Sequence, residues 1–283
     1  MWSSATLNAM LRSAKIAPVF DYALLERFWS DADALGFHSV WNYDHFYGLQ
    51  DLDQPTLEGW TTLAAMACRT QRARIGCMVT GITYRHPALL ANMAVTIDHM
   101  SGGRLEFGIG AAWHEPEHEG YGFDFPSAGT RIAMLDEACE VIRGLWTQDR
   151  VDHSGRFYTL RDARCFPKPV QDKIPITIGG TGERKTLRVV AKHADQWNAP
   201  SLSADPDEFK RLSGVLDEHC AAVGRDPSEI ARSVQLFVFP ESAKQIEGLD
   251  DTIAAYEAAG CEHMVVSFYT PPSSELLESL APR

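Results

Sequence analysis

Strand-like and helix-like segments alternate along this chain, and that alternation limits the possible folds more than any other feature of the sequence. Asp21 can cap a helix whose apolar face includes Leu25 and Phe28, and Gly36 ends this helix before the strand-like segment FHSVW. The same order returns near the C-terminus, where a helical pattern ends at Gly260 and CEHMVVSFY follows. Between them lie the strand-like segments RARIGCMVTG, GRLEFGIG, IPITIGG, DQWNA and SVQLFVF. Most of these are separated by helical patterns over 87–100, 130–146, 182–193 and 205–223.

Strands that alternate with helices predict a parallel sheet, and eight such units in 283 residues predict an α/β fold, a closed (β/α)8 TIM barrel. We expect a single domain over residues 1–283, with an insertion at 147–175 that contains a small hairpin and a proline-rich connector. The first strand, KIAPV at 15–19, is weak because the first 20 residues alternate poorly and look partly helical. Closure of the barrel is therefore in question at this strand. An open doubly wound sheet is disfavoured, because no G-x-G-x-x-G turn follows the first strand.

Charge and cysteine content exclude several classes of protein. The net charge of -12 argues against a broad nucleic-acid-binding surface, which needs clustered basic residues. The six cysteines form no C-x-x-C pair, as is typical of a reduced intracellular protein. No secretory signal and no run of 18 apolar residues is visible, so we expect a cytoplasmic protein without a membrane partner.

An acid and a histidine, Asp44 and His45, come shortly after the segment FHSVW and are separated from it by two residues. Active sites of (β/α)8 barrels lie at the C-terminal ends of the strands, so His45 is a candidate for proton transfer near neutral pH. On an ideal strand the side chain of Asp44 would point to the face opposite that of His45, so Asp44 could instead brace a loop. Ordinary turn chemistry, with Asp44 as a cap, is the alternative interpretation of the pair.

Glycines mark the ends of three other predicted strands. Gly76 and Gly81 in GCMVTG indicate a bulge or a close backbone approach to a ligand, or else a buried strand with loose ends. The small residues at 108–112 expose backbone N–H groups that can line an anion or a flat ring. Residues 179–182 lead into a predicted helix, whose N-terminus favours a phosphate; a ligand-free glycine turn is the alternative.

The segment HEPEH, at 114–118, has the letters of a zinc motif. That motif needs a helix, and Pro116 inside it disfavours one. We therefore predict no metal site here, but a polar loop in which His114 or Glu115 faces a pocket. Trp197, at the end of a later strand, can wall a pocket or simply pack in the core.

Several stretches together resemble the bacterial luciferase-like monooxygenase superfamily, and most closely its branch that uses the deazaflavin coenzyme F420. They are SVWNYDHF, TYRHPALLANMAVTIDHMSGGRLEFGIGAAW, PITIGGTGERKTLRVVAKHADQWN and the segment from Glu140 to Trp146. The resemblance implies a (β/α)8 barrel with insertions, frequently a homodimer, that holds a flavin or deazaflavin at the C-terminal mouth. It also implies a strand bulge with a non-proline cis peptide, for which Met78-Val79 is the candidate.

The resemblance also implies roles for individual residues, with His45 as the catalytic proton donor or acceptor. Some deazaflavin dehydrogenases carry an acid where Trp113 stands here, so Glu115 becomes the candidate acid beside His45. The implied cofactor-binding residues are Asp44, Met78, Val79, Thr80, Gly110, Ala111, Ala112, Gly179, Gly180, Thr181 and Gly182. The implied pocket walls are Trp41, Tyr43, Phe46, Trp113 and Trp197.

These roles predict an F420-dependent oxidoreductase that moves a hydride between reduced deazaflavin and a small organic substrate, with one proton passing through His45. Two alternatives stay open. One is an FMN-dependent luciferase-like monooxygenase, and the other is a non-catalytic flavin-binding relative. A separate flavin or deazaflavin reductase is a candidate partner, because it would supply the reduced cofactor.

Overall fold

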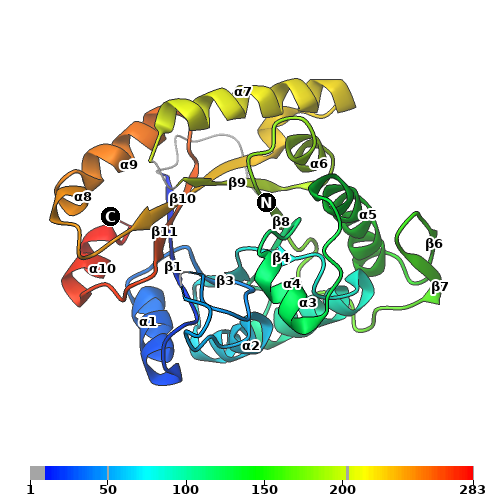
Figure 1. Ribbon diagram of the computed structural model, residues 1–283, viewed down its shortest axis with the longest axis horizontal. Coiled ribbons are helices and arrows are strands. Elements are labelled where there is room, and N and C mark those ends of the chain that lie inside the picture. Colours follow the sequence, from blue (N-terminus) through cyan, green and yellow to red (C-terminus); the bar gives the residue numbers. More distant parts are fainter. Residues whose placement is uncertain (1–9, 50, 202–203, 283) are drawn as a thin grey trace.

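A computed structural model of the chain describes residues 10–49, 51–201 and 204–282. The first 20 residues look partly helical from their sequence; of these, 1–9 lie outside the described residues, and 11–16 form a strand instead. Eight parallel strand positions close into a barrel, and the helices surround it (Figure 1). The barrel strands are β1 (Leu11–Ile16), β2 (Ser39–Asn42), β3 (Arg74–Cys77), β4 (Thr80–Gly81), β5 (Leu105–Gly110), β8 (Ile176–Gly179), β9 (Gln196–Ser201), β10 (Ala231–Val238) and β11 (His263–Phe268). Strands β3 and β4 are the two halves of one interrupted position, because both pair with β5.

The first strand closes the barrel, so the doubt about closure was wrong. Strand β1 lies at 11–16, not at 15–19, and pairs in parallel with β11 along its whole length and with β2 on its other side. Its pattern looked weak because the barrel interior is polar at this point. Ala14 and Ile16 belong to the main apolar core, whereas Ser13 and Lys15 make hydrogen bonds inside the barrel.

The helices begin and end close to their predicted limits. Asp21 caps α1, since its Oδ1 accepts a hydrogen bond of 2.9 Å from the N–H of Leu24. Gly36 then takes a left-handed conformation with φ of 83°. The exception is α6, which starts four residues later than predicted. The helices are α1 (Tyr22–Ala34), α2 (Gly59–Arg69), α3 (Pro87–Ser101), α4 (Glu115–Tyr121), α5 (Ala128–Thr147), α6 (Thr186–His193), α7 (Pro206–Val223), α8 (Ala243–Glu247), α9 (Leu249–Ala258) and α10 (Ser274–Leu280), with a short 3₁₀ turn at Pro227–Glu229.

The expected hairpin is present outside the barrel, as β6 (Val151–Ser154) and β7 (Thr159–Ala163). All six cysteines are free, and five of them are buried. Within the described ranges, no helix combines the length and the apolar content that a bilayer crossing needs.

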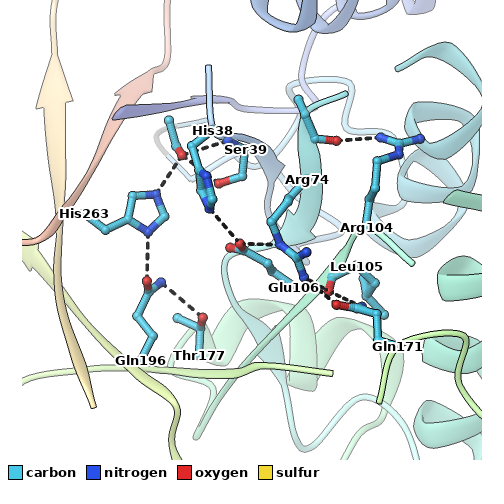
Figure 2. A network of polar contacts seen from close by, with 12 residues as sticks. His38, Ser39, Arg74, Arg104, Leu105, Glu106, Gln171, Thr177, Gln196 and His263 are labelled. Atoms are coloured by element: carbon cyan, nitrogen blue, oxygen red, sulfur yellow. Dashed lines mark hydrogen bonds and ion pairs between the residues drawn. The ribbon is translucent and has the colours of Figure 1, made fainter. Parts of the chain in front are cut away.

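A network of polar side chains fills the barrel near the N-terminal ends of its strands (Figure 2). Nδ1 of His263 donates to Oε1 of Gln196 at 2.8 Å, so Nε2 accepts from the hydroxyl of Ser13 at 2.7 Å. Burial lowers the pKa of His263 to about 4, which keeps this ring neutral. On the side of the network away from His263, Nε of Arg74 donates to Oε1 of Glu106 at 2.8 Å (Figure 2). Because this end is filled by polar side chains that bond to one another, the chemistry is expected at the other end.

Candidate functional site

A cavity of about 890 Å³ lies at the C-terminal ends of the barrel strands. It is the end where active sites of such barrels occur. Cavities of about 540 and 400 Å³ also exist, but their linings come from helices and loops on the outside of the barrel. The predicted residues that line the large cavity are Tyr43, Asp44, His45, Met78, Val79, Gly110, Ala111, Ala112, Trp113, Gly179 and Gly180.

His45 lies at the cavity wall, three residues beyond Asn42, the last residue of β2. It is 9% exposed, and its Nδ1 donates to Oε2 of Glu117 at 3.0 Å. The ring is held edge-on against Tyr43 and Trp113, with ring centres 5.0 and 5.5 Å away. Among the described residues, Nε2 of His45 has no hydrogen-bond partner. A fixed imidazole with one nitrogen on a carboxylate and the other unpaired is suited to proton transfer.

Glu117 is the functional residue that sequence reasoning missed. The segment HEPEH is not a loop, because Pro116 sits in the first turn of α4, where its missing N–H breaks no helical bond. The candidate acid Glu115 is exposed, whereas Glu117 is fully buried. A signal was present in the sequence: a proline in a first turn and Gly122 beyond the last residue are typical of a short helix.

The carboxylate of Glu117 is held by several donors. Its Oε1 accepts from the backbone N–H groups of Phe46 and Tyr47, at 2.5 and 3.0 Å, and its Oε2 accepts from the hydroxyl of Tyr84. Burial alone would raise the pKa of Glu117, but the hydrogen bond and charge of His45, followed by the other donors, lower the pKa to about 2. Glu117 is therefore ionised at neutral pH and orients His45.

Asp44 braces a loop, which was one of the two interpretations of the pair. Its two oxygens form a bidentate ion pair with Arg85, at 2.6 and 3.0 Å. Arg85 also pairs with Glu58, and Glu58 caps α2 by accepting from the N–H of Trp60 at 3.0 Å. This chain of contacts ties the end of β2 to the start of α2 and to the segment after β4.

The bulge between β3 and β4 contains a cis peptide at Met78-Val79, as the resemblance implied. The glycines around it are required by the protein's own packing. A Cβ on Gly108 would lie 2.0 Å from the carbonyl oxygen of Cys77, and one on Gly110 would lie 2.7 Å from Cγ2 of Val79. At Gly76 the close approach comes likewise from the protein, because a Cβ there would lie 2.2 Å from the ring of Trp41. The predicted bulge is confirmed, and the glycines around it leave room for the protein's own side chains and backbone.

The glycine segment after β8 lies partly at the cavity. Gly179 and Gly180 line it, whereas Thr181 and Gly182 are exposed and do not. Gly180 has φ of 130°, a conformation that glycine adopts without strain. Arg131 of α5 also lines the cavity and places a cationic side chain there.

Several aromatic and polar residues expected at the site lie behind the cavity wall. Trp41 is fully buried against Met78 and Val265. Trp197 stacks on Phe209 of α7 with ring centres 5.5 Å apart, which is the packing alternative. Phe46 packs on the rings of Tyr84, Tyr121 and Phe123, and Thr80 accepts a hydrogen bond from Trp60. Of the expected aromatic walls, only Tyr43 and Trp113 line the cavity.

Comparison with known proteins identifies the family. The luciferase-like monooxygenase family matches residues 1–271 of the chain. An uncharacterized protein of Mycobacterium tuberculosis is 35% identical over 182 residues, which cover 64% of this chain and 62% of that protein. The F420-dependent glucose-6-phosphate dehydrogenase of Amycolatopsis mediterranei is 35% identical over 212 residues, which cover 72% of this chain and 61% of the relative. The chain thus spans about three fifths of the length of these curated relatives.

Solved structures share the fold. An F420-dependent secondary alcohol dehydrogenase, solved with an F420-acetone adduct, superposes with a TM-score of 0.81 at 22% identity, over 95% of this chain and 96% of that one. At this identity the likeness concerns the fold alone, a closed barrel of eight parallel strands. Because the family match extends over nearly the whole chain, the protein belongs to the luciferase-like monooxygenase family.

Proposed function

We propose that this protein is an F420-dependent oxidoreductase that acts on a small organic substrate. The observation that carries the proposal is the pair formed by His45 and Glu117 at the wall of the large cavity. Curated relatives at 29–35% identity, named as F420-dependent glucose-6-phosphate dehydrogenases, support the choice of cofactor. When bound, the deazaflavin would supply or take up the hydride.

The cavity has features that suit a flat ring with an anionic tail. Met78, Val79 and Ala111 offer an apolar surface next to the bulge. Arg131 lies on the same cavity and would hold a phosphate through its guanidinium, whereas the N–H of Gly180 already donates to the carbonyl oxygen of Asn198 at 3.1 Å. A volume of about 890 Å³ lies in the range of cofactor sites and leaves room for a small substrate beside a ring.

The residues of the chain would contribute position and one proton. Glu117 fixes the Nδ1 side of the His45 ring, and Nε2 would give a proton to, or take one from, an oxygen of the substrate. Tyr43 and Trp113 hold the imidazole from two sides and limit the water around it. Asp44 keeps the loop in place through Arg85 and takes no part in the proton transfer.

A titration of the protein with F420 and with FMN, followed by absorbance, tests the proposal. F420 should bind more tightly. Replacing His45 with Ala should leave F420 binding largely intact and lower turnover by about 10²–10⁴. Unchanged turnover would remove His45 from the chemistry. Tighter binding of FMN, with oxygen consumption when a reductase supplies reduced flavin, would instead support the monooxygenase alternative.

A further inference from the structure

A buried lysine on the cavity floor has no role in the function proposed above. Lys15 of β1 is 3% exposed and lines the large cavity. Its ammonium donates to the carbonyl oxygen of Met78 at 3.0 Å and to Oε1 of Gln235 at 3.1 Å. The ring of Tyr43 lies 5.6 Å from the nitrogen. An ammonium has three donors, so one N–H of Lys15 is left without a partner among the described residues.

No carboxylate neutralises this charge. Among the residues that the structure describes, none forms an ion pair with Lys15. Asp44 on the same cavity is taken by Arg85, and Glu117 is taken by His45. The other polar groups around Lys15 are neutral at physiological pH, because burial raises the pKa of the Cys77 thiol and of the Tyr43 hydroxyl.

An unpaired ammonium is costly to bury, and proteins normally pair such a group. The chain has a net charge of -12, yet among the described residues no carboxylate forms an ion pair with either Lys15 or Arg131, the two cations that line this cavity. Burial lowers the pKa of Lys15 to about 7, so the group is close to losing its proton when no anion is present. An anionic oxygen in the cavity would take the free N–H and restore the charged form.

We propose that Lys15 binds an anionic oxygen of the substrate, and that the substrate is therefore a small organic acid. Tyr43 sets the geometry, because its ring contacts both Lys15 and His45. A substrate whose carboxylate lies at Lys15 would present its reactive part on the side of His45. The inference rests on the proposed function only in identifying the anion as part of the substrate.

Binding of a carboxylate and of its neutral isostere tests the inference without turnover. Fluorobenzoate and fluorobenzamide are titrated into the 283-residue chain and followed by fluorine NMR. The wild-type chain should prefer the carboxylate by about 10–100-fold, as expected for a hydrogen bond to a charged group. Lys15→Met should remove the preference, and Lys15→Arg should keep part of it. The control Lys210→Met, at an exposed lysine of α7, should keep all of it.

Each result decides the inference. Equal binding of the two probes to the wild type, or an unchanged preference in Lys15→Met, would overturn it. So would a Lys15→Met chain that loses affinity for reduced F420 but keeps the preference, because Lys15 would then serve the cofactor. If Lys15→Met does not fold, as judged by circular dichroism, Lys15→Arg and the wild-type comparison still decide. A carboxylate preference in a chain that binds no F420 would refute the proposed function and leave the anion site standing.

Discussion

Replacing Lys15 with methionine should stabilise the fold at acidic pH, by an amount that shrinks as the pH rises. Burial lowers the pKa of this ammonium from 10.5 to about 7 in the folded chain. Between these values the unfolded chain binds more protons than the folded one, so the Lys15 contribution to stability rises with pH. Below pH 7 the folded state carries the full cost of a charged amine inside the barrel. Methionine has a similar length and no charge, and it does not carry this cost.

The magnitude follows from the size of the shift. Each pKa unit corresponds to about 1.4 kcal/mol, so the full cost near pH 6 is at most about 4–5 kcal/mol. Near pH 9 the folded group is neutral and about half of that cost is gone. The advantage of the Lys15→Met chain should therefore fall by about 2–3 kcal/mol between these two conditions. The hydrogen bonds lost to Met78 and Gln235 lower the advantage by a constant amount, about 1 kcal/mol each, which does not alter its slope with pH.

Urea unfolding of both chains near pH 6 and near pH 9 measures this difference. Lys210→Met serves as the control, since Lys210 is exposed and its replacement should shift stability by less than about 0.5 kcal/mol at either pH. The reasoning fails if the difference between wild type and Lys15→Met is the same at both pH values. It fails equally if the wild type is the more stable chain only near pH 6.

The other expectations concern the proton-transfer pair and the bulge. Glu117→Gln keeps the shape of the side chain and removes the charge that orients His45, so kcat should fall by about 10–100-fold with F420 affinity unchanged, whereas Glu115→Gln, at an exposed position, should leave kcat alone. Gly108→Ala places a Cβ 2.0 Å from a backbone oxygen and should lower the thermal unfolding midpoint by several degrees or prevent folding. Gly214→Ala has open space within α7 and should raise the midpoint slightly, because alanine favours helix by about 1 kcal/mol. A Gly108→Ala chain as stable as the wild type would show that the bulge can move.

The structure removes the two reasons for expecting a non-catalytic relative. One was the weak first strand, which pairs on both sides and closes the barrel. The other was the missing acid beside His45, and Glu117 provides that acid from α4. Both reasons came from sequence patterns at positions where polar residues face the barrel interior or a proline starts a helix.

What the sequence determined by itself was local in character. Alternating periodicities identified the strands and helices, and the order of those elements implied a parallel barrel, because parallel strands need crossover connections. The position of His45 directly after a strand was enough to place it at the C-terminal mouth, since all parallel strands of a barrel point the same way. Gly76 and Gly81 indicated a bulge in the third strand, and the family resemblance implied the cis peptide at Met78-Val79.

Contacts between distant parts of the chain were decided only by the tertiary structure. His45 and Glu117 lie 72 residues apart, and no periodicity links them; the fold brings α4 against the end of β2. Whether an aromatic lines a pocket depends on its neighbours in the fold: Trp197 is stacked on Phe209 of α7, and Trp41 is buried against Met78 and Val265. Sequence reasoning assigned Lys15 no role beyond the start of the strand expected at 15–19, because a pattern of apolar residues cannot show that a barrel interior is polar next to a cavity.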